Sequence, residues 1–292
     1  MASLYNDKMA TIYDAMYQTF VDYDDEYQFY NTLIQENGCK SILEIGSGTG
    51  NLAHRFQENN QDYQGLDYSK SMIEIAKERN KNCLFIHGDM RDFTLEKLVD
   101  AILITGRSTS YLISNDDVND TFNCLFNNLS NEGIIIFDFI DANRFIPFIN
   151  ENQKIIHQAK HEGINYLRES HWETTSLDNF MLDWHAKYFT VNNTGTRELI
   201  ANDFSTVRVF TLNEIQLFLH INNFEILRTI DRKTYAYAEA SGGRHWLGRH
   251  PQPHHSGGAH HLLGDGFGQP PKNGNIRRFD SFFSRLGRYG GF

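Results

Sequence analysis

The sequence has few cysteines and no long apolar runs, and each absence excludes a class of protein. Its 292 residues include three scattered cysteines, which predict neither a disulfide framework nor a bound metal. The longest apolar runs, near residues 101–104 and 133–137, are much shorter than the ~18 residues of a membrane span. The N-terminus lacks the basic and apolar regions of a secretory signal. We therefore expect a reduced, cytoplasmic protein without a membrane partner.

Proline and basic residues are scarce over most of the chain. Residues 1–240 hold one proline, and 20 Lys and Arg against 35 Asp and Glu. Residues 241–292 hold four prolines and twelve glycines, with seven Lys and Arg against two Asp and Glu. The acidic first part argues against nucleic-acid binding, which depends on basic residues that neutralise phosphates. We predict one domain over 1–240, followed by a Gly/His/Arg/Pro-rich tail over 241–292 that is flexible or foreign.

Short apolar segments alternate with helical patterns in the first half of the chain. Helix starts are indicated by Ser71 with Glu74, and later by Thr211 with Glu214, which match the capping box. Strands that alternate with helices predict βαβ units and a mainly parallel, doubly wound α/β sheet. A ligand is expected at the carboxyl ends of its strands. The expected strands are Ser41–Ile45, Tyr63–Leu66, Cys83–His87, Ala101–Thr105 and Gly133–Phe139.

A glycine loop follows the first expected strand and opens a helix. Its sequence is Glu44-Ile45-Gly46-Ser47-Gly48-Thr49-Gly50. Asn51 stands where the dinucleotide fingerprint G-x-G-x-x-G needs its third glycine, so the loop fits G-x-G-x-G instead. Asp67 ends the second expected strand, where an acid accepts hydrogen bonds from ribose hydroxyls. Asp89 follows the third strand, where it is placed to accept a hydrogen bond from an adenine amine.

These three features, in this order, resemble the class I S-adenosylmethionine-dependent methyltransferases. Those enzymes carry an E-x-G-x-G-x-G loop, an acid at the end of strand two and a Gly-Asp pair after strand three. The resemblance implies a Rossmann-like sheet of seven strands, S-adenosylmethionine as cofactor and S-adenosylhomocysteine as product. The cofactor-binding residues that it implies are Tyr13, Glu44, Gly46, Gly48, Asp67, Tyr68, Met72, Asp89, Met90 and Thr105.

Finer details resemble small-molecule N-methyltransferases over roughly residues 8–235. They lie in Tyr13–Tyr17, Gly88–Phe93 and Ser108–Leu112, and they are similar to enzymes that N,N-dimethylate nucleotide-linked amino sugars or methylate glycine and sarcosine. Thr105–Ser108 stands where base and glutamine N-methyltransferases carry N/D-P-P-Y/F, and no Pro-Cys nucleophile of a cytosine enzyme is present. The resemblance implies methyl transfer to a small amine. O-methylation of a small alcohol or acid, and non-catalytic cofactor binding, remain open.

Residues 151–208 form an insertion after the fifth expected strand. Apolar and polar residues alternate between Phe180 and Phe189, which is the period of a half-buried strand. Neighbouring segments show the same pattern, and Asn192–Gly195 predicts a turn between two of them. The antiparallel sheet that this predicts resembles the lid of sugar N-methyltransferases.

Candidate catalytic and substrate residues follow from the chemistry of methyl transfer to an amine. The amine loses a proton, and a nearby tyrosine or histidine receives it; the candidates are Tyr17, Tyr111 and His171. Trp184 is expected to face the substrate, and guanidinium groups suit an anionic part of it. The substrate-binding candidates are thus Arg107, Arg208 and Trp184, although the sugar enzymes carry a small residue at the position of Arg107. The expected partner is a small-molecule substrate, and the chain is either a monomer or a homodimer.

The end of the expected domain departs from the family pattern. The resemblance implies a last strand, antiparallel to its neighbours, that begins near Thr234. Instead, the composition changes abruptly at residues 238–245. We therefore expect this strand to be lost, which would leave one part of the sheet open.

Overall fold

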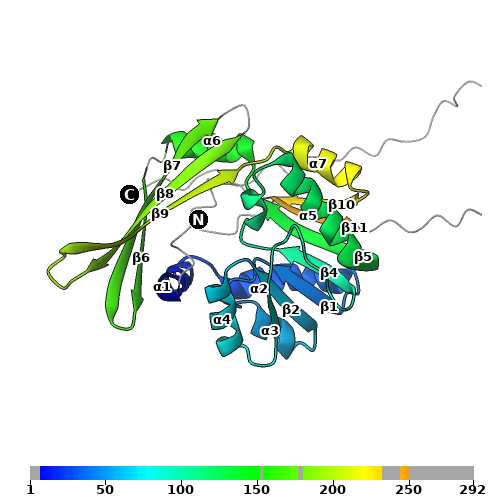
Figure 1. Ribbon diagram of the computed structural model, residues 1–292, viewed down its shortest axis with the longest axis horizontal. Helices are drawn as coiled ribbons and strands as arrows, with labels where there is room; N and C mark the ends of the chain where they lie inside the picture. Colours follow the sequence, from blue (N-terminus) through cyan, green and yellow to red (C-terminus); the bar gives the residue numbers. More distant parts are fainter. Residues whose placement is uncertain (1–6, 152–153, 177–179, 232–243, 250–292) are drawn as a thin grey trace, which may run out of the picture. The chain divides into compact units, whose positions relative to one another are not determined.

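The computed structural model describes residues 7–151, 154–176, 180–231 and 244–249, which contain two β-sheets (Figure 1). The larger sheet has seven strands in the order β10-β11-β5-β4-β1-β2-β3. Strands β1 to β5 are parallel, so the predicted Rossmann-like α/β fold is confirmed. The strands are β1 (Ser41–Ile45), β2 (Asp62–Asp67), β3 (Leu84–His87), β4 (Val99–Ile104), β5 (Leu129–Phe139), β10 (Glu225–Asp231) and β11 (Arg244–Arg249).

Helices cover both faces of this sheet, and the second half of β4 shows why its central strands are largely apolar. Ala101 and Leu103 point into a core with α2, α3 and α4. Ile102 and Ile104 point into a second core with α5 and α7. Because both faces are buried, the run from Ala101 to Ile104 is apolar at every position instead of alternating with polar residues. The helical elements are α1 (Asp7–Tyr17), α2 (Tyr23–Glu36), α3 (Ala53–Glu58), α4 (Lys70–Arg79), the 3₁₀ turn η1 (Ser108–Tyr111), α5 (Asn115–Asn128), α6 (Ala142–Glu151) and α7 (Leu212–Ile221).

Helix caps agree with the sequence at one predicted helix and differ at another. Thr211 and Glu214 form the predicted capping box of α7. The cap of α4 is Ser69, whose hydroxyl accepts a hydrogen bond from the Met72 N–H. The capping box predicted from Ser71 was therefore wrong by two residues, because the chain turns into the helix as soon as β2 has ended.

The second sheet is the insertion predicted as a lid, and we call it the lid sheet. It contains β6 (Ile155–His161), β7 (Ile164–Ser176), β8 (Met181–Val191) and β9 (Arg197–Arg208), each antiparallel to the next. One face packs on α1, where Met9, Ile12 and Met16 contact Tyr166 and Tyr188. Trp172 of β7 and Trp184 of β8 also lie on this inner face. Successive side chains of a strand point to opposite faces, so the residues next to each tryptophan lie on the outer face.

The last strand of the large sheet is present, so the prediction that it is lost was wrong. Residues 244–249 form β11, which lies between β5 and β10 and is antiparallel to both. The sheet thus extends past the domain boundary predicted at residue 240. Residues 232–243 and 250–292, which include the predicted tail apart from β11, lie outside the described residues. Within the described part of the chain, no helix is long and apolar enough to cross a membrane.

Candidate functional site

A cavity of about 630 Å³ opens at the carboxyl ends of β1, β2, β3 and β4. Its volume lies within the ~300–1,000 Å³ that small-molecule and cofactor sites occupy. The structure brings together all the residues that the sequence implied for cofactor binding, because the ends of parallel strands converge at one edge of the sheet. These lining residues are Tyr13, Glu44, Gly46, Gly48, Asp67, Tyr68, Met72, Asp89, Met90 and Thr105.

The glycine loop follows a path that only glycine follows without strain. Gly46 has a φ of 72° and Gly48 a φ of 53°. A Cβ atom at Gly46 would lie 2.1 Å from the Oγ atom of Ser108 in η1. The Gly48 N–H donates a hydrogen bond of 2.8 Å to Asp67 Oδ2. The loop is thus fixed between η1 and the end of β2, with its backbone along the cavity wall.

Asp67 is positioned to accept hydrogen bonds from a ligand. Besides Gly48, the Ser69 N–H donates to its Oδ1 atom at 2.8 Å. Burial raises the pKa of Asp67, although these two backbone N–H groups favour the charged form. Each carboxylate oxygen has a second lone pair. Asp67 therefore has capacity left for the two hydroxyls of a ribose.

Asp89 is held by a neighbouring cation at the cavity wall. Arg91 donates to both of its carboxylate oxygens, through Nε at 3.0 Å and through a terminal nitrogen at 2.6 Å. These hydrogen bonds hold the pKa of Asp89 below its ordinary value. Arg91 also pairs with Asp117 of α5. Asp89 is thus ionised and fixed in orientation, as an acceptor for an amine must be.

Glu44 is buried beneath the glycine loop. Its carboxylate accepts hydrogen bonds from the hydroxyls of Tyr63 and Thr105. Burial raises the pKa of Glu44 to about 7, and these two hydrogen bonds oppose the increase. Glu44 therefore ties the start of the loop to β2 and β4.

A polar network that the sequence analysis missed fixes α1 against the loop. Asp14 accepts hydrogen bonds from Thr49, Asn51 and Arg79, so that α1, the glycine loop and α4 meet at one carboxylate. Burial acts to raise the pKa of Asp14, but these bonds outweigh it and the pKa is lowered. The three partners lie 35 to 65 positions away in the sequence, so no local pattern indicated the network.

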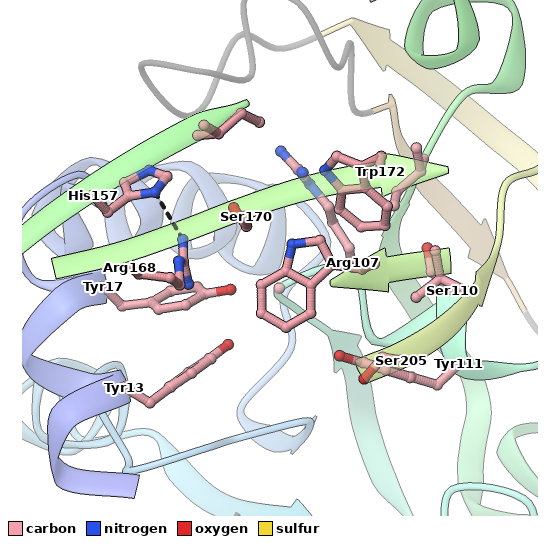
Figure 2. A pocket seen from close by; sticks show the side chains of 15 residues that line it. Tyr13, Tyr17, Arg107, Ser110, Tyr111, His157, Arg168, Ser170, Trp172 and Ser205 are labelled. Carbon is pink, nitrogen blue, oxygen red and sulfur yellow. Dashed lines mark hydrogen bonds between the residues drawn. The ribbon is translucent and has the colours of Figure 1, made fainter. Parts of the chain in front are cut away.

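A second cavity, of about 80 Å³, lies between α1, η1 and the inner face of the lid sheet (Figure 2). Tyr13 and Tyr17 enter it from α1, with their rings stacked at 4.1 Å, and Tyr111 enters from η1. These tyrosines and Gly106 also line the large cavity. The two cavities therefore adjoin each other at these three tyrosines.

A buried arginine and a neutral histidine form another wall of the small cavity. His157 Nδ1 lies 2.9 Å from a terminal nitrogen of Arg168. Burial, with the charge of Arg168, lowers the pKa of His157 to about 4. The imidazole is thus neutral at pH 7 and accepts a hydrogen bond from the guanidinium. The Arg168 guanidinium also lies 5.6 Å from the centre of a Trp184 ring. No local sequence pattern indicated either residue.

The predicted catalytic and substrate residues divide into two groups. Tyr17, Tyr111, Arg107 and Trp184 line the small cavity. His171 and Arg208 line neither cavity.

His171 is on the outer face of the lid sheet, and the Arg208 side chain contacts Phe210 and residues of α7 instead of lining either cavity. The Arg208 guanidinium pairs with Glu214 and stacks near the rings of Phe210 and Phe218. These two positions do not fit the catalytic role expected of His171 or the substrate-binding role expected of Arg208. The alternating pattern gave each strand two faces, but it did not indicate which face meets the cavity.

A family model described as a methyltransferase domain matches residues 42–133. The match contains the glycine loop, Asp67, Asp89 and Thr105. The chain carries a methyltransferase domain. The matched segment ends within β5, so α1, the lid sheet and the last two strands of the large sheet lie outside it.

Relatives of known sequence extend the comparison beyond this domain. The chain is 25% identical over 187 residues to the glycine/sarcosine N-methyltransferase of Aphanothece halophytica, covering 60% of this chain and 69% of that enzyme. It is 26% identical over 137 residues to a dTDP-3-amino-3,6-dideoxy-alpha-D-glucopyranose N,N-dimethyltransferase of Streptomyces fradiae. That match covers 46% of this chain and 54% of the enzyme, so the chain spans only about half the length of this relative.

The fold is shared over a greater length than the sequence. The crystal structure of the sugar N-methyltransferase KedS8 from Streptoalloteichus superposes with a TM-score of 0.69. Identity is 18%, and the match covers 86% of this chain and 98% of that one. The methyltransferase domain and the lid sheet thus have the fold of known class I methyltransferases.

Proposed function

We propose that this protein transfers a methyl group from S-adenosylmethionine to the nitrogen of a small-molecule amine. The observation that carries the proposal is the junction of the two cavities at Tyr13, Tyr17 and Tyr111. A methyl donor in the large cavity and an acceptor in the small one would meet there. The similarity to N-methyltransferases of amino sugars and of glycine supports nitrogen as the acceptor atom.

The residues of the large cavity fit the proposed cofactor. Asp67 offers acceptor lone pairs for ribose hydroxyls, and Asp89 offers an ionised carboxylate for an adenine amine. The buried side chain of Met72 provides an apolar wall beside them. Gly46 and Gly48 leave the space along the loop free of side chains. When bound, S-adenosylmethionine supplies a methyl group on a sulfonium, which is already activated for attack by an amine.

The protein's own contribution is to orient the acceptor and exclude water. In this proposal the hydroxyl oxygens of Tyr17 and Tyr111 accept N–H hydrogen bonds from the amine, which would direct its lone pair toward the large cavity. His157 is a poor base because its pKa is about 4. Its role is therefore to hold Arg168 in place.

The small cavity also has features that favour one kind of amine. Arg168 and Arg107 line it, and both guanidinium groups are cations at any physiological pH. The rings of Trp172 and Trp184 lie beside them. We propose an amine that also carries an anionic group, such as a carboxylate or a phosphate ester.

A panel of acceptors tests the proposal directly. The purified chain is incubated with S-adenosylmethionine and amino-sugar nucleotides, glycine derivatives, biogenic amines or hydroxyl analogues of each, and the products are identified by mass spectrometry. The proposal expects N-methylated product from an anionic amine. It also expects kcat to fall by about 10-fold in Tyr111→Phe, because one hydrogen bond to the acceptor is lost.

Two outcomes would contradict the proposal. Methyl transfer only to the hydroxyl analogues would assign the chain to O-methylation. Cofactor binding without transfer to any acceptor would indicate a non-catalytic protein. Tyr166→Phe serves as a matched control, because this tyrosine lies on the same lid face but lines neither cavity; it should leave kcat unchanged.

A further inference from the structure

The outer face of the lid sheet carries two histidines and a glutamate at one point. His171 of β7 lies directly opposite His185 of β8 in the antiparallel register. Glu173 follows two positions after His171, so it projects from the same face. None of these three lines either cavity. The group therefore needs an account separate from methyl transfer.

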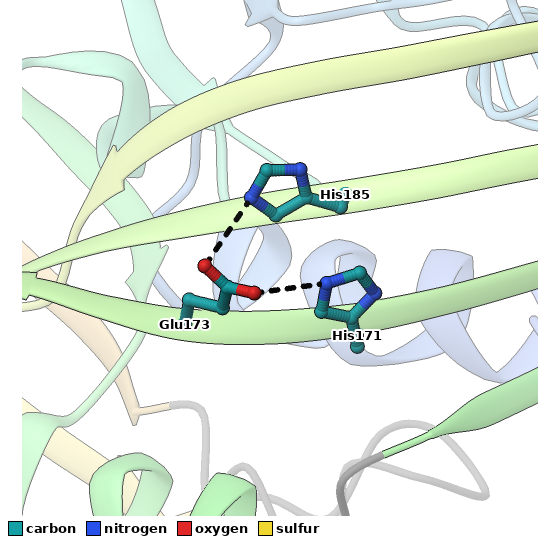
Figure 3. A group of neighbouring side chains, drawn as sticks. All are labelled: His171, Glu173 and His185. Atoms are coloured by element: carbon teal, nitrogen blue, oxygen red, sulfur yellow. Dashed lines mark hydrogen bonds and ion pairs between the residues drawn. The ribbon is translucent and has the colours of Figure 1, made fainter.

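The three side chains converge on a common centre (Figure 3). His171 Nε2 lies 3.2 Å from Glu173 Oε1, and His185 Nε2 lies 3.8 Å from Glu173 Oε2. The imidazole rings stack with centroids 4.9 Å apart and planes 7° from parallel. One donor atom from each residue lies within 4.8 Å of the others. Ligand atoms around tetrahedral zinc are about 3.4 Å apart, given Zn–N and Zn–O distances of about 2.0–2.1 Å. The two Nε2–Oε distances of 3.2 and 3.8 Å bracket this spacing, and rotation of the imidazole rings out of their stack would turn both nitrogen lone pairs toward one ion.

Charge on this face favours a cation at the cluster. Glu173 lies directly opposite Asp183 in the β7–β8 register, and like charges in opposite positions destabilise a sheet. Asp183 accepts a hydrogen bond of 2.7 Å from the Thr206 hydroxyl of β9, which fixes its carboxyl group on this face. Two acidic side chains therefore lie opposite each other beside the imidazoles, and a divalent cation bound there would offset their mutual repulsion.

Access and rigidity also suit a metal ion. The side chains of His171, His185 and Glu173 are 43%, 36% and 63% exposed, so an ion reaches them directly from solvent. The Phe204 ring contacts the His185 ring at 5.0 Å, which restricts its orientation. Two imidazoles and a carboxylate form the donor set of His₂Glu zinc sites, which keep a fourth position for water.

We propose that His171, His185 and Glu173 form a zinc-binding site on the outer face of the lid sheet. The ion joins β7 to β8 and stabilises the lid sheet without taking part in methyl transfer. This assignment gives His171 a ligand's role in place of the catalytic role expected from the sequence. It also departs from the expectation of no metal, which rested on the scattered cysteines and on the lack of Cys or acidic partners for the histidine pairs of the tail.

Titration of the full chain with Zn²⁺ tests the site. Isothermal calorimetry is run on the metal-free protein and on His171→Ala, His185→Gln and Glu173→Gln, after circular dichroism shows that each is folded. The wild type should bind one more zinc ion per chain than the histidine variants, or bind its tightest ion at least about 10-fold more strongly. Zinc should also raise the unfolding temperature of the wild type, because ligand binding to the folded state stabilises it.

Histidines elsewhere in the chain require a matched control. His220→Ala removes an exposed histidine of α7 and should keep the zinc stoichiometry of the wild type. The histidine pairs at 254–255 and 260–261 remain in every variant, so their binding cancels in the comparison. If wild type, His171→Ala and His185→Gln bind zinc with equal stoichiometry and affinity, the site is refuted. The same holds if zinc raises their unfolding temperatures equally.

Discussion

At the level of single residues, the burial of Glu44 makes the free energy of unfolding depend on pH. Its pKa is raised to about 7 by burial, whereas a glutamate in the unfolded chain has a pKa of about 4.3. Between these values the folded protein keeps a proton that the unfolded chain releases. The free energy of unfolding therefore falls as the pH rises through this window, and the contribution is constant below it.

Glu44→Gln should remove this pH dependence. Because glutamine does not titrate, the variant's free energy of unfolding should rise by roughly 1–3 kcal/mol relative to wild type between pH 4.5 and pH 7. Urea denaturation at a series of pH values measures the difference. Glu58→Gln, at an exposed position, should follow the wild-type profile. Parallel profiles for wild type and Glu44→Gln would show that Glu44 is not the group responsible.

Gly46 is predicted to be required for two separable reasons. Gly46→Ala should lose about 1–2 kcal/mol from its positive φ, and more from the contact with Ser108. Ser108→Gly in the same chain should recover only the second part. Urea denaturation of the single and double variants gives the coupling. Gly163→Ala, with a φ of 81° and no atom within 4 Å, should show the φ effect alone. No coupling between positions 46 and 108 would contradict this account.

Gly46, Asp67, Asp89 and Thr105 of the large cavity were predictable because each lies at or just after the end of a strand. The strand ends are visible in the sequence as the points where apolar segments stop, and topology brings them to one edge. Asp14 and Arg168 were not predictable in this way. Their partners are distant in sequence, and their roles depend on how α1 and the lid sheet pack.

At the scale of elements, α1 joins the lid sheet to the methyltransferase domain. Its apolar residues contact β6, β7 and β8, and Asp14 on the same helix contacts the glycine loop. Tyr13 and Tyr17 line both cavities, so their positions depend on these contacts. We therefore expect damage to the Asp14 network to weaken ligand binding.

Asp14→Asn should lower the affinity for S-adenosylhomocysteine by about 10-fold, because hydrogen bonds to a charged group contribute ~1.5–3 kcal/mol each. Calorimetric titration measures the change. Asp24→Asn removes the exposed ion pair between α2 and Arg55 and should bind like wild type. Equal affinities for wild type and Asp14→Asn would show that α1 does not contribute to this site.

The lid sheet illustrates how far a sequence pattern extends. Alternation between residues 180 and 189 correctly predicted a strand with two faces. It did not indicate that the face of Trp184 meets the cavity and that the face of His171 meets solvent. This choice is made by the contacts of Tyr166 and Tyr188 with α1, which are not local.

At the scale of the whole molecule, the sheet is completed from a segment of unusual composition. The change near residue 240 suggested that the last strand was lost, yet residues 244–249 pair with β5 and β10. Every non-proline residue offers a backbone N–H and C=O for the ladder, so this proline-free segment with Gly and Arg is able to pair as a strand. Residues Met1–Pro253 form one compact unit that includes it.

Truncation should show the importance of β11. A chain that ends at residue 253 should unfold within a few degrees of the full chain. A chain that ends at residue 243 leaves both β5 and β10 with unpaired edges, and should unfold at a lower temperature and aggregate. Thermal unfolding followed by circular dichroism, with light scattering, distinguishes them. Equal stability of the two truncated chains would mean that β11 is dispensable.

The large cavity is proposed to bind the methyl donor, and calorimetric titration with S-adenosylhomocysteine detects such binding without depending on the identity of the acceptor. We predict a Kd on the order of 1 μM for the folded wild-type chain, and a loss of about 100-fold in Asp67→Ala, since up to two hydrogen bonds to a carboxylate disappear. Asp62→Ala, at the opposite end of the same strand, should bind like wild type. A folded wild-type chain that does not bind, or an Asp67→Ala variant that binds equally well, would contradict the assignment of the cavity.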